Sequence, residues 1–319
     1  MSCRVLITGV SGFVGGALGV YLRSLGGYHV TGVSRRLARE GSADSFRPLD
    51  LARPIPLDLG DFDAIVHAAA LSAPWGSPEK FQAQNVDATR NMLEFAKTKA
   101  AKKFVFISSS SVYYRHGDQL GISEETPFPE RPINLYAATK VTGERLVRES
   151  GLSAVILRPR AVFGPGDTVL FPRILRAARN GVLPRMKRTD GTTPMGDLIY
   201  IENLSHYIER ALALPCEGSF NLTNDEPVDL FAFLRDIVAR LGLKPAERAI
   251  PVGVAFAIAG LLEFGSRVLG GYREPPITRF GVEVMAYSKT FDVSRAIRAF
   301  GAPPVSLAEG VDRFVAWQR

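Results

Sequence analysis

The stretch Arg4-Val-Leu-Ile-Thr-Gly-Val-Ser-Gly-Phe-Val-Gly15 decides the fold class. Its first five residues are typical of a buried strand, and Phe13–Leu25 is typical of a helix with one apolar face. The glycines at 9, 12 and 15 allow a sharp turn and a close approach of the backbone to a pyrophosphate. The helix N-terminus then offers free N–H groups to phosphate. This pattern predicts a nucleotide-binding turn; the alternative is a tight turn without a ligand.

Strands and helices continue to alternate through the first half of the sequence. Further strands are expected at 29–33, 63–68, 103–108 and 154–157, and helices at 78–99 and 135–149. Such alternation produces a parallel sheet covered by helices on both faces. We therefore expect an α/β fold with a doubly wound parallel sheet of the Rossmann type and a smaller, interleaved C-terminal substrate domain.

The composition of the chain changes after Gly164, where proline and glycine become frequent. Residues 1–164 are expected to form the nucleotide-binding domain and residues 165–319 mainly the substrate-binding domain. A strand at 197–201 and a strand at 220–222 are expected to return to the first sheet, so that about 197–224 belongs with it.

The second strand ends in Ser34-Arg35-Arg36, where a dinucleotide-binding fold often has an acidic residue for the ribose 2′-hydroxyl. A carboxylate there would repel a 2′-phosphate, whereas an arginine would pair with it. The run predicts a preference for NADP(H), with NAD(H) as the other option; the alternative is a solvated loop. Asp50-Leu51 follows the third strand position, where the aspartate either reaches the adenine amino group or caps a helix.

Tyr136 and Lys140 lie one helical turn apart in the expected helix 135–149. The usual pKa of a tyrosine, about 10, is too high for a base at neutral pH. A lysine ammonium on the same face, together with the positive nicotinamide ring, would stabilise the phenolate. A hydroxyl of the serine run 108–111 would hold the substrate oxygen. The pattern predicts proton and hydride chemistry at a carbonyl or secondary alcohol; ordinary helix surface is the alternative.

The composition limits the class of protein. The 319 residues are 46% hydrophobic and 22% charged, with a formal net charge of +7. The charges are mixed along the chain, which argues against a nucleic-acid surface and fits a phosphate-bearing cofactor. Two distant cysteines, Cys3 and Cys216, indicate a reducing cytoplasm. We expect no metal. No apolar run reaches the ~20 residues of a membrane span.

The apolar segment 249–262 has three interpretations. It lines a pocket for a hydrophobic substrate, makes peripheral contact with a membrane surface, or forms a buried core helix. The core helix is the favoured interpretation, because Gly253 and Gly260 suggest close packing.

The sequence resembles the extended short-chain dehydrogenase/reductase superfamily, in its epimerase/dehydratase and 3β-hydroxysteroid-dehydrogenase branch. The matching motifs cover most of the first half: Thr8-Gly9-x-x-Gly12-x-x-Gly15, Asp50-Leu51, His67–Ala70, Asn85–Leu93, Phe106–Tyr113, Tyr136–Lys140 with Glu144, Leu157–Pro159 and Phe163–Gly166. The C-terminal third is similar to sterol dehydrogenases and β-keto-acid reductases, at Ile250–Val252, Leu261–Phe264, Glu274–Phe280, Phe291–Ala296 and Leu307–Gly310.

The resemblance implies a role for each matching position. Tyr136 would be the acid/base, Lys140 its partner and Ser109 the orienting hydroxyl, with Ser110 as its rival. His67 would be structural. The cofactor would contact Gly9, Ser11, Gly12, Phe13, Val14, Gly15, Ser34, Arg35, Arg36, Asp50, Leu51, Ala68, Ala69, Ala70, Tyr136, Lys140, Pro159, Arg160 and Val162. Ser110 and Phe163 would contact the substrate.

Asn85 would support a water relay, and the helices at 78–99 and 135–149 would form a homodimer. Two positions depart from the family pattern. Tyr114 stands where many members have glycine, and Ser34-Arg35 replaces a common acidic residue.

The leading hypothesis is an NADPH-dependent reductase of an apolar, sterol-like or β-keto-acyl-like small molecule. The first alternative is a nucleotide-sugar epimerase or dehydratase with tightly bound NAD, in which Arg173, Arg176 and Arg185 would bind a diphosphate. The second is a non-catalytic NADP(H)-sensing protein, which the presence of both Tyr136 and Lys140 disfavours.

Overall fold

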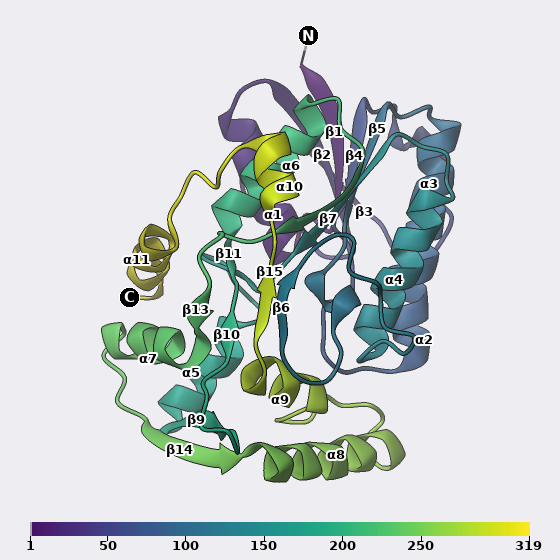
Figure 1. Cartoon of the computed structure of the whole chain (residues 1–319). Coiled ribbons are helices and arrows are strands. Elements are labelled where there is room, and N and C mark those ends of the chain that lie inside the picture. The colour runs from purple at the N-terminus through teal and green to yellow at the C-terminus, as the bar shows by residue number, and fades with distance from the viewer. Residues whose placement is uncertain (1) are drawn as a thin grey trace.

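The main sheet has seven parallel strands in the order β12-β7-β5-β4-β1-β2-β3 (Figure 1). The computed structural model describes residues 2–319. The strands are β1 (Cys3–Thr8), β2 (Tyr28–Ser34), β3 (Ser45–Pro48), β4 (Ala64–His67), β5 (Lys103–Ile107), β7 (Ala154–Pro159) and β12 (Gly218–Leu222). The strand order reverses between β1 and β4, which is where a doubly wound sheet opens its ligand crevice.

Helices cover both faces of this sheet. On one face, α1 (Phe13–Ser24) packs beside α6 (Ile201–Ala213), and on the other α3 (Ala88–Thr98) packs beside α4 (Leu135–Arg148) (Figure 1). Alternate residues of β1 serve the two faces: Val5 and Ile7 belong to the core under α1 and α6, and Leu6 to the core under α3. The predicted doubly wound α/β fold is confirmed.

The helix expected at 78–99 begins as α2 (Pro78–Phe81) and ends as α3, with a π-helical stretch, Gln82–Asp87, between them. A π-helical turn moves side chains out of the ordinary helical register and is frequent at functional sites. Asn85 lies in this stretch, where it is buried. The homodimer predicted through these helices stays a prediction.

The second region contains smaller sheets. One has four strands in the order β13 (Val228–Asp229), β10 (Met195–Gly196), β15 (Lys289–Phe291) and β6 (Gln119–Ile122), and another pairs β14 (Ala246–Pro251) with β9 (Val182–Lys187). The helices of this region are α5 (Phe171–Arg179), α7 (Leu230–Arg240), α8 (Val252–Val268), α9 (Arg279–Ala286), α10 (Ser294–Phe300) and α11 (Leu307–Gln318). Strand β6 comes from the first half of the chain, so the halves exchange strands in both directions.

The return of 197–224 to the main sheet occurs only in part. Strand β12 pairs with β7 as expected, but β11 (Ile199–Tyr200) pairs with β8 (Val162–Phe163) in a separate two-stranded sheet. The cause lies between β7 and β8, where Ala161 has a φ of 43°. This left-handed residue ends the regular strand, so β8 and its partner leave the main sheet.

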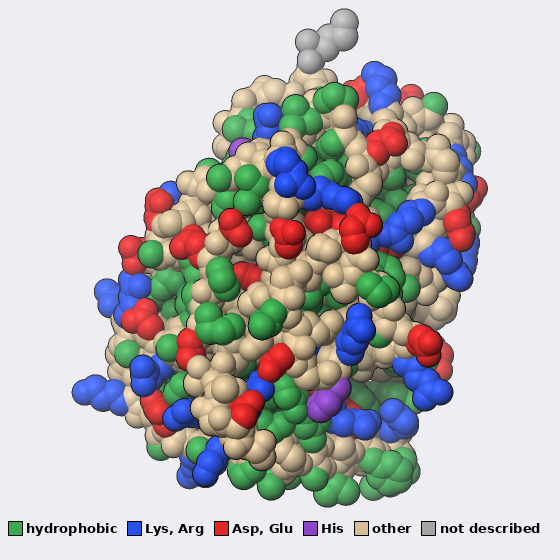
Figure 2. All heavy atoms as spheres, in the orientation of Figure 1, with side chains coloured by type: hydrophobic (Ala, Val, Ile, Leu, Met, Phe, Trp, Pro, Cys, Tyr) green, Lys and Arg blue, Asp and Glu red, His purple; other side chains and the backbone are tan. Residues whose placement is uncertain are grey.

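Helix α8 differs from the favoured interpretation of 249–262 as a core helix. It buries Ala255, Ala259 and Glu263, and its other face is apolar and exposed, with Leu261 74% and Phe264 66% accessible. Apolar side chains gather at the lower edge of the molecule, where α8 lies (Figure 2). Two of its three buried residues are alanines, and large apolar residues face outward. Peripheral membrane contact through this segment stays a prediction. None of the helices within residues 2–319 is long and apolar enough to cross a membrane.

Candidate active site

A cavity of ≈ 830 Å³ lies at the carboxyl ends of the main-sheet strands. Its floor is formed by residues that end or follow β1, β2, β4, β5 and β7: Gly9, Ser34, Ala68, Ser108 and Pro159. The second region supplies the facing wall, chiefly through residues 274–278 and α9. The sheet therefore brings separate stretches of sequence to one crevice, as expected where the strand order reverses.

The glycine turn after β1 is closely packed against the end of β4. Gly9 has a φ of 73°, and a Cβ on it would lie 2.8 Å from the Cα of Ala69. A Cβ on Gly15 would lie 2.5 Å from the carbonyl oxygen of Gly9. The N-cap of α1, Gly12, makes no side-chain capping hydrogen bond. A turn that excludes side chains and leaves the helix N–H groups uncapped fits a dinucleotide pyrophosphate.

Residues predicted to hold the adenosine end line the same cavity. Ser34 is buried with its hydroxyl donating to the carbonyl of Arg36 (2.7 Å), while both Arg35 and Arg36 are exposed. Arg35 donates to the amide oxygen of Gln84 (3.1 Å). Asp50 is exposed and accepts from the N–H of Ala52 (3.2 Å), so its carboxylate caps a turn rather than a helix. Leu51, which follows it, is buried.

His67, at the end of β4, is fully buried beneath the cavity. Its ring bonds the hydroxyls of Thr8 (2.9 Å) and Thr89 (3.1 Å). Burial, with a smaller contribution from the Lys140 charge, lowers the pKa of His67 to about 3, so the ring is neutral. Thr8 also accepts from the N–H of Ala69 (3.0 Å). The ring therefore joins the glycine turn to the Ala68–Ala70 segment, which is a structural role.

The phenol of Tyr136 faces the hydroxyls of Ser72 and Ser109. Burial raises the pKa of Tyr136, and hydrogen bonding to these two hydroxyls opposes the rise. In this environment the phenol is protonated at neutral pH and can donate a proton. The loop after β4 thus places a further hydroxyl, that of Ser72, beside the predicted Tyr136–Lys140 pair.

Lys140 lies below Tyr136 on α4 and is buried. Its Nζ donates to the carbonyl of Ile107 (2.6 Å) and lies 5.9 Å from the centroid of the Tyr136 ring. Burial lowers the pKa of Lys140 to about 8, and the charge of Glu144 opposes that effect. The ammonium is therefore close to its titration range at physiological pH.

The two candidate serines have different surroundings. Ser109 bonds Ser111 (2.9 Å) and contributes to the hydrogen bonding of Tyr136. Ser110 bonds the phenol of Tyr114 (3.0 Å) instead. These contacts favour Ser109 as the orienting hydroxyl.

A buried polar network centred on Glu144 supports α4. The carboxylate of Glu144 accepts two hydrogen bonds from Arg158 (2.6 and 2.8 Å) and one from Ser108 (2.6 Å). Arg158 also donates to Tyr113, which itself donates to Asn221 (3.0 Å). Paired, hydrogen-bonded charges of this kind tolerate burial, and they fix β5, α4 and β7 relative to one another.

Asn85 also has a structural connection. Its Oδ1 accepts from the N–H of Leu71 (2.6 Å), and its Nδ2 donates to Thr139 (2.9 Å). The side chain ties the loop that carries Ser72 to the helix that carries Tyr136. The predicted water relay stays a prediction.

Phe163 departs from its predicted substrate contact. It is fully buried and packs against Phe171, Tyr200, Phe233 and Phe314 (ring centroids 5.6–6.4 Å apart). It does not line the cavity, because the turn at Ala161 directs β8 into the core. Every other residue predicted for the cofactor, catalysis or substrate lines the cavity.

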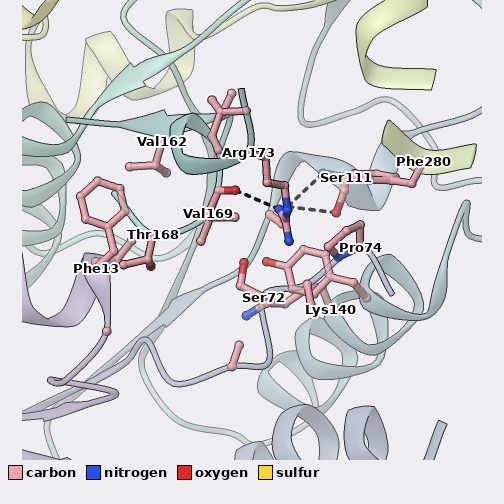
Figure 3. Close-up of a pocket in the computed structure, with 18 of the residues that line it drawn as sticks. Phe13, Ser72, Pro74, Ser111, Lys140, Val162, Thr168, Val169, Arg173 and Phe280 are labelled. Atoms are coloured by element: carbon pink, nitrogen blue, oxygen red, sulfur yellow. Dashed lines mark hydrogen bonds between the residues drawn. The ribbon is translucent and has the colours of Figure 1, made fainter. Parts of the chain in front are cut away.

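Several lining residues were not among the predicted site residues, including Ser72, Tyr114 and the segment 274–285, and Arg173 was named only for a diphosphate in the nucleotide-sugar alternative. Arg173 extends from α5 into the cavity towards Ser72, donating to the carbonyl of Val169 (2.9 Å) and pairing with Glu274 (2.7 Å) (Figure 3). Ser72 follows a strand end, a position that favours function. Tyr114 and Glu274–Phe280 were noted in the family resemblance, but no site role was assigned to them. Within residues 2–319, no group of three or more acidic, histidine or cysteine side chains could hold a metal.

The comparisons with known proteins agree on the family. The model of the NAD dependent epimerase/dehydratase family matches residues 5–222. A 2-alkyl-3-oxoalkanoate reductase of Shewanella oneidensis is 32% identical, over 98% of this chain and 86% of that protein. The human sterol-4-alpha-carboxylate 3-dehydrogenase, decarboxylating, is 29% identical, over 79% of this chain and 73% of that protein.

Solved structures share the fold along its whole length. MoeE5 in complex with UDP-glucose and NAD has a TM-score of 0.78 and 26% identity, covering 99% of this chain and 98% of that one. The Bordetella bronchiseptica enzyme WbmH in complex with NAD+ has a TM-score of 0.77 at 20% identity, covering 100% of this chain and 99% of that one, which concerns the fold alone.

Proposed function

The chain belongs to the NAD-dependent epimerase/dehydratase family and is an NAD(P)-dependent oxidoreductase, and we propose that it uses NADPH to reduce a keto group of an apolar small molecule. The observation that carries this proposal is the meeting of Ser109, Tyr136 and Lys140 at one cavity. Much of the remaining lining is apolar: Ala73 and Pro74 from the loop after β4, and Leu234, Ile277, Val282, Val284 and Met285 from the second region.

In the proposed reaction, side chains of the protein bind and protonate the carbonyl oxygen of the substrate. The hydroxyl of Ser109 donates to this oxygen and holds it against the phenol of Tyr136. Tyr136 transfers its proton to the oxygen as negative charge develops there. The ammonium of Lys140 stabilises the resulting phenolate through its charge. NADPH, when bound, supplies the hydride that the carbonyl carbon receives, so the product is a secondary alcohol and NADP⁺.

The cofactor preference rests on the end of β2. Arg35 and Arg36 are exposed at the rim of the cavity, and Ser34 stands where a carboxylate would repel a 2′-phosphate. A guanidinium and a phosphate form strong, charge-assisted hydrogen bonds. These features support NADPH over NADH.

The names of the relatives support a keto substrate. Two relatives, from Shewanella oneidensis and Stenotrophomonas maltophilia, are named as reductases of 2-alkyl-3-oxoalkanoates, at 32% and 31% identity. The cavity carries the proton donor and the apolar wall that such a substrate requires.

The nucleotide-sugar alternative is supported by the complex of MoeE5 with UDP-glucose and NAD. It is disfavoured by the placement of the arginines that it needs. Arg176 and Arg185 do not line the cavity, and Arg185 lies over the ring of Phe231 (5.6 Å). Arg173 lines it but is paired with Glu274. Of these three arginines, only Arg173 could therefore meet a diphosphate in the cavity, and Glu274 already neutralises its charge.

The decisive experiment measures both cofactor affinity and net consumption. NADPH and NADH are titrated by fluorescence, and NADPH oxidation is followed with methyl 3-oxooctanoate. We expect a preference of about ten- to a hundredfold for NADPH, with stoichiometric formation of the alcohol. Tightly retained NAD, conversion of a UDP-sugar and no oxidation of NADPH would instead establish the epimerase.

A further inference from the structure

We propose that Arg160 binds a carboxylate of the substrate next to the reacting carbonyl, which makes the preferred substrate a 3-oxo acid with an apolar tail. This inference rests on the proposed keto reduction. Arg160 follows β7 directly and lines the cavity with 8% of its surface exposed. Its Nε is buried and has no hydrogen-bond partner in the part of the chain that the structure describes.

Arg158, two residues earlier, is also buried but has hydrogen-bond partners for its side-chain nitrogens, so the unpaired Nε of Arg160 requires an explanation. The Nε and both terminal nitrogens of Arg158 bond Glu144 or Tyr113. Buried polar groups in native proteins nearly always have a partner, because leaving one unpaired is costly. A buried guanidinium that faces a cavity therefore points to an acceptor supplied by a ligand. A carboxylate fits the planar, bidentate geometry of this group best.

The immediate neighbours of Arg160 hold the guanidinium in place without satisfying its Nε. The guanidinium carbon lies over the ring of Tyr114, 5.4 Å from the centroid, and Phe280 stacks on the same residue. Lys289 also faces this ring, but its ammonium is bonded to Arg115, Gly117, Gln119 and Glu283. Burial raises the pKa of Asp197 to about 6, and the charge of Arg160 is one of the effects that oppose the rise. The hydrogen bond that the Asp197 carboxylate accepts comes from the N–H of Phe291 (2.8 Å), not from Arg160.

A chain of contacts places this subsite beside the proposed reaction centre. Tyr114 bonds Ser110 (3.0 Å), and the preceding residue, Ser109, faces Tyr136. A carbonyl at Tyr136 and a carboxylate at Arg160 are thus recognised beside adjacent residues of the serine run. We therefore assign to this site an acid whose carbonyl and carboxyl groups are separated by one carbon, a 3-oxo acid.

The sheet order argues against a phosphate of the cofactor as the partner of Arg160. Arg160 lies at the end of β7, and the glycine turn follows β1, with β4 and β5 between them. Three strand spacings amount to about 14 Å. Sequence reasoning grouped Arg160 with the cofactor residues; its position favours the substrate end instead.

The test compares a carboxylate with its neutral ester in the NADPH-bound enzyme. Octanoate and methyl octanoate are titrated calorimetrically into the wild type, Arg160→Met and Arg160→Lys. Arg160→Met should weaken octanoate binding by about 10- to 100-fold and leave methyl octanoate within about twofold. Arg160→Lys keeps the positive charge but lacks the planar, bidentate guanidinium, so it should give an intermediate loss. This variant provides the test if Arg160→Met does not fold.

Arg176→Met is the matched control, because Arg176 is exposed on α5 outside the cavity and should change neither affinity. Equal losses for acid and ester, or unchanged octanoate affinity, would overturn the assignment of Arg160. Turnover is measured separately with 3-oxooctanoate and methyl 3-oxooctanoate. If the wild type reduces neither, the proposed keto reduction is wrong, while the octanoate titration still decides on Arg160.

Discussion

The Lys140 ammonium donates a 2.6 Å hydrogen bond to the carbonyl of Ile107, the last residue of β5. This bond joins the middle of α4 to the strand that leads into the serine run. It fixes the position of Tyr136, one turn earlier on the same helix, relative to Ser109, which follows β5. This buried lysine therefore contributes, with the Glu144 network, to the positions of the proton donor and the orienting hydroxyl.

We predict that Tyr136→Phe lowers kcat by about 10²- to 10⁴-fold, the usual contribution of a positioned proton donor. Because the phenol is directed at the substrate, the affinity for NADPH should change by less than about twofold. Single-turnover kinetics and NADPH fluorescence titration measure these quantities. Full turnover by this variant would exclude Tyr136 as the acid.

The pH dependence of the rate should report the titration of Lys140. Burial lowers its pKa to about 8, so the ammonium is charged below this pH and neutral above it. We expect kcat/KM to fall as the pH rises through about 8, since the charge beside Tyr136 is then lost. A Lys140→Arg variant would keep a positive charge at this position, and its profile should stay flat to about pH 10. The same fall in both proteins would assign it to another group.

The arginines at the end of β2 should decide between the two dinucleotides. Arg35→Ser removes a guanidinium from the rim and should weaken NADPH binding by about ten- to a hundredfold. NADH has no 2′-phosphate, so its affinity should stay within about twofold. Titration of both cofactors measures the ratio. A parallel loss for NADH would mean that Arg35 shapes the loop through Gln84.

His67 should make the protein less stable in acid. Burial lowers its pKa to about 3, whereas the unfolded chain binds the proton near about pH 6.5. Between these values the unfolded state holds more protons, so the free energy of unfolding decreases as the pH falls, by at most about 1.4 kcal/mol per pH unit. His67→Asn should flatten this slope in urea titrations from about pH 4 to 7. An unchanged slope would attribute the acid sensitivity to other groups.

Helix α8 offers a matched pair of substitutions. Leu261 is 74% exposed, so Leu261→Ser should change the free energy of unfolding by less than about 0.5 kcal/mol. Ala259 is fully buried on the opposite side, so Ala259→Leu should cost about 1–3 kcal/mol through overpacking. Thermal unfolding of both variants provides the comparison. A large loss for Leu261→Ser would mean that another surface covers this face in solution.

The features that could be predicted from the sequence are those that depend on local patterns of residues. The glycine turn, the strands around it and the Tyr136–Lys140 pair are short-range features, and each was predicted close to its observed place. Phe163 was misplaced because one left-handed residue, Ala161, redirects its strand, and no sequence period reports that turn. The interpretation of α8 as a core helix was favoured over an exposed one for a similar reason, since apolar character does not say which neighbours a helix receives.

Local sequence patterns also could not predict that residues 274–285 form a wall of the cavity or that the Nε of Arg160 has no hydrogen-bond partner. They arise only when the second region closes over the sheet. Tyr114 was recognised as a departure from the family pattern, but its meaning depends on contacts with Arg160 and Phe280, which lie far away in sequence.

The exchange of strands between the two halves affects how the molecule can unfold. β6 lies in the sequence between Ser109 and Tyr136 but pairs with β15, and β12 returns from the second half to the main sheet. Neither half can separate without breaking ladders in both sheets. Denaturant should therefore melt the whole chain in one cooperative transition, and a cut before β15 should abolish the catalytic geometry rather than release an active nucleotide-binding fragment.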